Sequence, residues 1–131
     1  MVDVLIDLLQ MMWIEVIVAP YEADAQIAYM VWEGIADVGI SEDSDLLVYG
    51  CPRLITKLRN PGDCQLIDMN DLYSRKQHEN PTMASLAQFP RETLIELCIM
   101  AGCDYLPSIK QIGLKSGLKH YSKHKTFAKV I

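Results

Sequence analysis

The chain has 131 residues, of which 50% are hydrophobic and 22% charged, and a formal net charge of -5, which favours one globular domain and leaves little room for two. The apolar stretch from Met1 to Met12 has neither the basic flank of a signal peptide nor the length of a membrane span, so we expect a cytosolic or nuclear protein without a membrane partner. The four cysteines form no CxxC pair and the three histidines complete no zinc spacing, which favours reduced structural thiols.

The first third of the chain is predicted to alternate helices with short buried strands. Apolar residues at helical spacing from Val2 to Leu9 predict an opening amphipathic helix of about three turns. The apolar run from Ile14 to Ala19 predicts a buried strand, Tyr21 to Glu33 a helix, and Val38 to Ile40 the next strand. A strand, helix and strand in this order indicate a parallel, right-handed crossover in an α/β sheet.

Turn-forming residues divide the middle of the chain. Strands are predicted at Arg53 to Leu58 and at Gln65 to Ile67, and the Asn-Pro-Gly-Asp sequence between them predicts a hairpin. A short helix is expected at Asn70 to Lys76. The polar segment from Gln77 to Phe89 is expected to be a surface loop.

The last third is predicted to be helical and becomes basic. Helices are expected at Arg91 to Ala101, at Gly113 to Tyr121 and after Lys123. Residues 105–131 contain six lysines and no acid, whereas the rest of the chain carries the other six basic residues against all 17 acidic ones. This asymmetry indicates a polyanion at the basic end and cations at the acidic end. A basic helix that only faces solvent is the open alternative.

Carboxylates follow the predicted carboxyl ends of both strands in the first third, at the edge where open α/β sheets bind ligands. Asp43 and Asp45 are two residues apart, so in an extended segment they share one face. Glu22 and Asp24 diverge by about 200° on a helix. This second pair converges on the first only if the first helical turn points at the site.

Carboxylates crowded at one edge repel each other, and a divalent cation relieves the conflict. Oxygen ligands without a nearby histidine or cysteine favour magnesium or manganese over zinc. Two such ions roughly 4 Å apart activate water and stabilise the leaving oxygen of a phosphodiester. The alternative is that Ser41 to Asp45 forms an ordinary solvated turn with a helix cap, and the residue types leave both open. Glu42 is expected to point away from Asp43.

Three ordered acidic motifs resemble those of the flap endonuclease and exonuclease superfamily of 5′-nucleases, and the Tyr-Glu-Ala-Asp-Ala-Gln form of the first is similar to the exonuclease one group. The motifs lie at Ala19 to Tyr29, Gly39 to Cys51 and Ile99 to Leu106. The resemblance implies an α/β fold with a partly parallel sheet and flanking helices, like an incomplete PIN-type nuclease core. It also implies a metal-binding nuclease region at 1–104 and a helix-two-turn-helix element for DNA binding at 105–131.

The resemblance implies a site of two magnesium ions, for which manganese may substitute, with water as the nucleophile. By position, Glu22 and Asp24 would serve one ion. Asp43, Asp45 and Asp104 would serve the other, and these five carboxylates are the candidate catalytic residues. The role of Asp104 comes from the resemblance alone, because its spacing would otherwise indicate only the end of a helix.

The segment from Ser108 to Lys119 resembles the helix-two-turn-helix element, which in the family grips the backbone of duplex DNA. Ser108 and the carbonyl of Ile112 would contact a potassium ion. The family usually has glycine where this chain has Gln111, so a turn that requires positive φ would strain this residue. The expected DNA contacts are Lys110, Gly113, Lys115 and Lys119.

The motifs and the resemblance together predict a magnesium-dependent, structure-specific 5′-nuclease of the 5′-3′ exonuclease or flap endonuclease type, acting in DNA repair in the nucleus. Its substrate would be double-stranded DNA with a free 5′ end, a gap or a flap. In the family a preceding segment supplies further strands, two more aspartates and basic residues, so we expect a fragment that needs a separate N-terminal nuclease segment for efficient turnover. A non-catalytic DNA-binding remnant and a protein-interaction scaffold are the alternatives.

Overall fold

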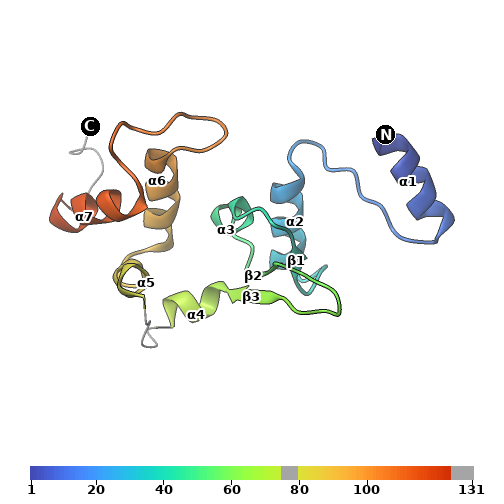
Figure 1. The fold of residues 1–131 in the computed structure, drawn as a ribbon, viewed down its shortest axis with the longest axis horizontal. Coiled ribbons are helices and arrows are strands. Elements are labelled where there is room, and N and C mark those ends of the chain that lie inside the picture. The colour runs from blue at the N-terminus through green and yellow to red at the C-terminus, as the bar shows by residue number, and fades with distance from the viewer. Residues whose placement is uncertain (75–79, 125–131) are drawn as a thin grey trace.

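The computed structural model describes residues 1–74 and 80–124, and it has the predicted mixed α/β class. Figure 1 shows an elongated arrangement with α1 at one end, the sheet in the middle and α6 and α7 at the other end. None of the helices within these ranges is long and apolar enough to cross a membrane. In chain order the elements are α1 (Val2–Met11), α2 (Ala23–Trp32), β1 (Gly39–Ile40), α3 (Asp45–Tyr49), β2 (Arg53–Thr56), β3 (Gln65–Asp68), α4 (Met69–Tyr73), α5 (Pro81–Leu86), α6 (Arg91–Ala101) and α7 (Leu114–His124).

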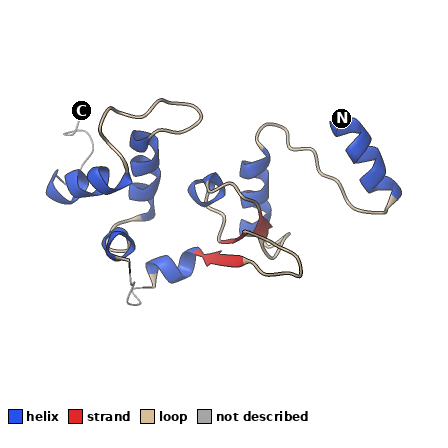
Figure 2. Ribbon diagram, viewed as in Figure 1, coloured by secondary structure: helices blue, strands red, loops and turns tan. Residues whose placement is uncertain are grey.

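A small sheet of order β1-β2-β3 lies at the centre of the chain (Figure 2). β1 pairs with β2 in parallel, with Gly39 opposite Leu54. β2 pairs with β3 in antiparallel register, with Arg53 opposite Asp68 and Thr56 opposite Gln65. The predictions of a partly parallel sheet and of a hairpin in the middle of the chain are therefore confirmed.

The predicted strand at Ile14 to Ala19 is wrong, because this segment has no regular secondary structure and pairs with no strand. The backbone of a strand needs a neighbouring strand for its hydrogen bonds, and β1 to β3 are the only strands in the described sheet. Ile17 and Val18 are accordingly 51% and 72% exposed. The predicted crossover from this segment to β1 does not form, and the parallel pair is instead β1 and β2, joined through α3.

The helices agree with the sequence patterns except at α3, which no pattern predicted, and between Gln77 and Phe89. α4 corresponds to the helix expected at Asn70 to Lys76, of which residues 75 and 76 lie outside the described residues. α1, α2 and α7 lie within a few residues of their predicted ranges, and α6 coincides with its predicted range. The predicted surface loop instead contains α5, where the side chain of Asn80 accepts a hydrogen bond from the Thr82 amide (2.9 Å) and Leu86 is buried. The helix expected after Lys123 falls largely outside the described residues, and α7 itself continues to His124.

The interior consists of two apolar clusters. The sheet cluster joins α2, α3 and the sheet through Ala28, Val31, Leu46, Cys51 and Leu54. The helical cluster joins α5, α6 and α7 through Leu86, Leu97, Met100 and Leu118. All four cysteines are unpaired, as expected. The boundary expected at residue 104 stays a prediction.

The link from α6 to α7 contains two residues with left-handed backbone conformations. Gly102 ends α6 with φ +102°, and a Cβ atom there would lie 2.9 Å from the amide nitrogen of Ser108, so only glycine fits. The Ile109 amide donates to the carbonyl of Met100 (3.1 Å), which holds the returning chain against α6. Gln111 has φ +66°, so the turn does require the conformation that favours glycine.

Replacing Gln111 with glycine should therefore stabilise the protein. The left-handed conformation costs a residue with a side chain about 1–2 kcal/mol, which glycine would avoid. The greater flexibility of glycine in the unfolded chain offsets about 0.5–1 kcal/mol of this stabilisation. We expect a net increase of roughly 0.5–1 kcal/mol in the free energy of unfolding, measured with urea. Lys110→Gly, at a neighbouring position without positive φ, is the control and should destabilise. A Gln111→Gly variant less stable than the parent would contradict the strain.

Candidate active site

The five predicted carboxylates come from three separate parts of the chain. Glu22 is the N-cap residue of α2, and Asp24 lies in the first turn of that helix. Asp43 belongs to the loop that follows β1, and Asp45 is the first residue of α3. Asp104 lies in the turn after α6. The carboxyl ends of a strand and of a helix, together with the start of α2, thus supply the acidic groups.

The loop between β1 and α3 is organised by its own side chains. The amide of Asp43 donates to Oγ of Ser41 (3.0 Å), and Oδ1 of Asp43 accepts from the amide of Asp45 (2.9 Å). Glu42 points elsewhere, because its Oε1 accepts from the amide of Lys57 at the end of β2 (2.8 Å), as expected. The loop is therefore a hydrogen-bonded turn, and the turn uses only one of the two Asp43 oxygens.

A tight turn presents Asp104 next to Tyr105. The amides and carbonyls of Cys103 and Leu106 exchange two hydrogen bonds (3.0 and 3.1 Å), which places Asp104 and Tyr105 at the tip between them. The Tyr105 hydroxyl lies 2.8 Å from the hydroxyl of Tyr49 at the end of α3. This hydrogen bond ties the Asp104 turn to the helix that begins with Asp45. Sequence patterns gave no signal for this pair, since 56 residues separate the two tyrosines.

The pKa of the Tyr105 hydroxyl is raised, in part by the acidic cluster. Its hydrogen bond with Tyr49 raises the pKa of Tyr105 most, followed by loss of solvent and by the charge of Glu22. Like any tyrosine with a pKa of 10 or above, Tyr105 is protonated at neutral pH and can donate a hydrogen bond. Tyr105 thereby places a neutral donor beside the Glu22 carboxylate.

Two of the five carboxylates, Asp24 and Asp45, have a raised pKa. Partial burial raises the pKa of Asp24 most, and the charges of Asp43, Asp45, Glu22 and Asp104 raise it further. The pKa of Asp45 is raised by partial burial, then by Asp43 and Asp104. Acidic groups whose pKa is raised by neighbouring carboxylates are a common mark of metal and catalytic sites.

The donor chemistry suits a hard divalent cation, although the side chains are not drawn together around one. All five groups are carboxylates, which favour magnesium or manganese. Within residues 1–74 and 80–124, no three His, Cys, Asp or Glu side chains lie close enough to hold a metal ion. A cation at this site would have to draw the carboxylates closer and would relieve their repulsion.

The residues predicted to contact DNA and potassium lie beyond the Asp104 turn. Ser108 is exposed and packs against Gly102. Ile112 contacts the helical cluster, and the Gly113 amide donates to Oγ of Ser116 (2.9 Å) rather than to solvent. The lysines predicted to contact DNA are all exposed, namely Lys110, Lys115 and Lys119.

The sequence matches a family model and curated relatives. The family model of the XPG I-region matches residues 13–104. Exonuclease 1 of Arabidopsis thaliana is 38% identical over 127 residues, which cover 97% of this chain and 16% of the relative. The chain therefore spans about a sixth of the length of that relative.

Solved structures share the fold. Flap endonuclease-1 from Methanococcus jannaschii superimposes with a TM-score of 0.79 at 29% identity, covering 99% of this chain and 38% of that one. The Holliday junction-resolving enzyme GEN1, in complex with product DNA and a Mg2+ ion, gives a TM-score of 0.62 at 28% identity and covers 81% of this chain and 25% of that one. The fold is thus that of the flap endonuclease class of 5′-nucleases. Within this class, the chain belongs to the XPG I-region family.

Removing one charge from the cluster should stabilise the fold at neutral pH. Because the pKa of Asp24 is raised on folding, its ionised form disfavours the folded state, and this penalty disappears as the pH falls below the ordinary value of 3.8. Asp24→Asn should therefore raise the free energy of unfolding at pH 7 by less than about 1 kcal/mol, since the charge is largely exposed and the helix end favours it. The gain should vanish at acidic pH.

Asp3→Asn is the matched control, because Asp3 also lies in the first turn of a helix but does not contribute to the raised pKa of Asp24 or Asp45. This variant should gain nothing at pH 7, since it loses only the favourable interaction with the helix end. Chemical unfolding at both pH values measures the differences. An Asp24→Asn variant that is less stable than the parent at pH 7 would contradict the repulsion.

Proposed function

We propose that this chain supplies carboxylate ligands to the active site of a magnesium-dependent, structure-specific 5′-nuclease that hydrolyses DNA phosphodiesters in nuclear DNA repair. The proposal rests on the five carboxylates that α2, the loop after β1, the start of α3 and the turn after α6 contribute, and the raised pKa of Asp24, caused by partial burial and by the other four, agrees with it. Charges that repel one another at a cost in stability are explained by a cation that they share. The nuclease names of the Arabidopsis and Methanococcus proteins support the reaction class.

Each carboxylate has a proposed role. Glu22 and Asp24 would hold one ion at the start of α2, and Asp43, Asp45 and Asp104 would hold a second. When bound, the ions would supply Lewis-acid stabilisation of the charge on the phosphate. Asp43 keeps one oxygen on the Asp45 amide, which fixes the loop and leaves its other oxygen for an ion. The Mg2+ ion in the GEN1 complex supports this choice of metal, and manganese would substitute.

The tyrosine pair would position the second ion's ligands. Asp45 and Tyr49 lie at opposite ends of the five-residue helix α3. The hydrogen bond between the hydroxyls of Tyr49 and Tyr105 therefore fixes the Asp104 turn relative to Asp45. Because the two hydroxyls are 2.8 Å apart, this link restrains α6 and α3 without introducing charge. Positioning of this kind matters because small misplacements of reacting groups slow phosphodiester chemistry.

The basic end would hold the DNA. The exposed lysines of the link and of α7 would meet the phosphates of a duplex with a 5′ end, a gap or a flap. Ser108 and the Ile112 carbonyl would take a potassium ion in the link. The product DNA in the GEN1 complex supports a nucleic-acid partner for this fold.

A second candidate function is a DNA-binding module without catalysis. It is favoured by the spacing of the acidic side chains, since no three of them in the described residues lie close enough to hold a metal. The two functions differ in whether the carboxylates bind a divalent ion.

Magnesium titrated into the protein should release or absorb heat, measured by calorimetry, because ion binding relieves the repulsion among the carboxylates. The double variant Asp43→Asn with Asp45→Asn should lose most of this heat, since two proposed ligands become neutral. Glu42→Gln is the matched control from the same loop, because its side chain is engaged with the Lys57 amide. Equal heats from the double variant and the parent would exclude the site. Equal losses in the double variant and Glu42→Gln would indicate a nonspecific charge effect.

Cleavage separates the nuclease from the DNA-binding module. The chain by itself is expected to bind 5′-flap and 5′-recessed duplexes but to cut them slowly, because no three of the acidic side chains in the described residues lie close enough to hold an ion without rearrangement. Asp104→Ala should abolish any magnesium-dependent cleavage. Persistence of cleavage in this variant would exclude Asp104 from the site, whereas efficient cleavage by the parent would contradict the expected slow turnover.

A further inference from the structure

A pocket of about 360 Å³ lies where the end of α2, the end of α3 and the start of α6 meet. Its lining residues are Trp32 from α2, Val48 and Tyr49 from α3, and Arg91, Glu92 and Ile95 from α6. Because Arg91 begins α6 and Asp104 follows the end of that helix, about 15 Å of helix separates the pocket from the Asp104 turn. The pocket is therefore a different place on the molecule from the candidate metal site.

The guanidinium of Arg91 is held in position within this pocket. Its Cζ atom lies 5.4 Å from the centroid of the Trp32 ring, which is a cation–π contact. It also packs closely against Gly50, since a Cβ atom at that position would overlap with Nη2 of Arg91. An aromatic ring and a residue without a side chain thus fix the place of this cation.

Arg91 is held in this way without an acceptor for its hydrogen-bond donors. Within residues 1–74 and 80–124, no carboxylate forms an ion pair with Arg91 and no hydrogen bond engages its guanidinium. A guanidinium carries five N–H donors in a planar arrangement that matches a carboxylate. A donor group that is already in position loses little entropy when a ligand binds, so Arg91 is preorganised for an anionic group.

Two large aromatic side chains beside Arg91 remain accessible. Trp32 is 62% exposed and Tyr49 is 42% exposed. The position of the Tyr49 ring is fixed, because its hydroxyl is hydrogen-bonded to that of Tyr105 (2.8 Å). Tryptophan, tyrosine and arginine are the residues that contribute most to binding energy at protein–protein interfaces. Their presence around one pocket indicates a surface for a protein partner.

Glu92 in the lining favours a peptide over DNA as the occupant. A DNA strand would bring successive phosphates past this carboxylate, and like charges repel. A peptide can place one carboxylate on Arg91 and turn backbone N–H donors toward Glu92. Val48 and Ile95 are half-buried in the same lining and offer contact to a neighbouring apolar side chain.

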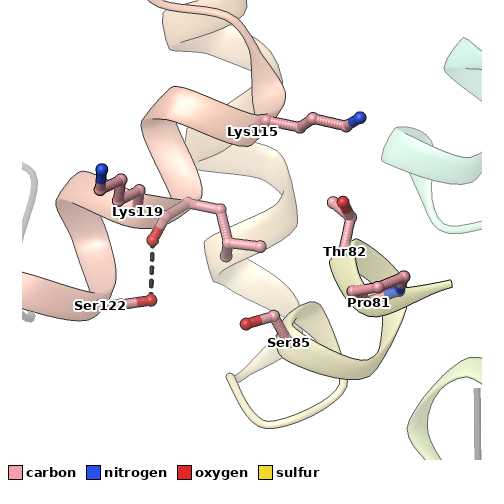
Figure 3. A pocket seen from close by; sticks show the side chains of 7 residues that line it. Pro81, Thr82, Ser85, Lys115, Lys119 and Ser122 are labelled. Atoms are coloured by element: carbon pink, nitrogen blue, oxygen red, sulfur yellow. Dashed lines mark hydrogen bonds between the residues drawn. The ribbon is translucent and has the colours of Figure 1, made fainter.

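The pocket of about 340 Å³ between α5 and α7 has no such arrangement. Its two cations, Lys115 and Lys119, point away from each other (Figure 3). The Ser122 hydroxyl in its lining already donates to the carbonyl of Leu118 (2.8 Å). The polar groups of that pocket therefore do not meet at one ligand, which sets it apart from the pocket around Arg91.

We propose that the pocket formed by α2, α3 and α6 is a docking site for a protein partner that places an acidic side chain on Arg91. The occupant is a short peptide segment in which aspartate or glutamate stands next to a large apolar residue. The acidic side chain takes the free donors of Arg91, and the apolar one covers Trp32 and Ile95. This inference goes beyond the proposed nuclease function and does not depend on it.

A phage library of random peptides, panned against the chain, tests for this occupant. The enriched peptides should share an acidic residue next to a large apolar one. Synthetic copies with a fluorescent label should bind the chain in an anisotropy titration. Analogues in which the acidic residue is replaced by its amide should bind about tenfold more weakly, the effect of one charged hydrogen-bonded pair.

Variants of the chain locate the binding. Arg91→Gln should weaken the enriched peptides about tenfold, and Arg91→Lys should lose less, because lysine keeps the charge but not the planar donors. Arg59→Gln is the matched control, since Arg59 is exposed in the turn between β2 and β3 and lies outside the pocket. Trp32→Ala should also weaken binding, whereas Trp13→Ala removes an exposed tryptophan outside the pocket and should not.

Several results would overturn the docking site. These are an absence of enriched peptides, enriched peptides without an acidic residue, and equal binding to the parent and to Arg91→Gln. A short DNA duplex that displaces the peptides and itself binds Arg91→Gln more weakly would show a nucleic-acid surface instead. Circular dichroism and thermal unfolding check that each variant is folded. If Arg91→Gln does not fold, the peptide analogues and the pair of tryptophan variants decide the outcome.

Discussion

The burial of Leu46 is the constraint on which the acidic site depends. This side chain is fully buried between α2 and the sheet, and it anchors a helix of only five residues. A helix this short has little stability of its own, so its position comes from the packing of Leu46. Because Asp45 begins the helix and Tyr49 ends it, that packing fixes an acidic group on one side and the link to Tyr105 on the other.

The acidic groups of the site lie in surroundings that disfavour their ionised form. Partial burial and the neighbouring carboxylates both raise the pKa of Asp24 and Asp45, so the ionised cluster weakens the fold that carries it. The sheet cluster and the helical cluster supply the compensating apolar burial on either side. This division of tasks is common at functional sites, where a local cost in stability is offset by the surrounding core.

Local signals in the sequence predicted the elements that depend on local chemistry. α6 was predicted from its apolar spacing and the glycine that ends it, and the hairpin from the turn residues at 60–63. The segment Ile14 to Ala19 failed because a strand is defined by its partner, which no local pattern supplies. α5 was missed although Asn80 followed by Pro81 is a local signal for the start of a helix. The burial of its Leu86 against other helices is a tertiary contact that no local pattern shows.

The difference between local sequence signals and tertiary contacts also applies to the site. The spacing of Asp43 and Asp45 indicated a shared face, whereas Asp104 was found only through the family resemblance, since α6 and α3 come together only through tertiary contacts. The Tyr49 and Tyr105 pair and the pocket formed by α2, α3 and α6 were not predicted, because each joins residues from distant parts of the chain. Side chains that act across two helices leave no periodic signal in either.

The small sheet has a consequence for handling the protein. In the described residues β1 pairs only with β2, so its other edge presents backbone donors and acceptors, and Ile40 there is 57% exposed. Ile17 and Val18, which lie outside any strand, are exposed apolar residues of the same chain. An open strand edge is a template on which a strand of another molecule can pair. Concentrated solutions of this chain should associate through backbone pairing, and soluble partners that cap this edge would keep it monomeric.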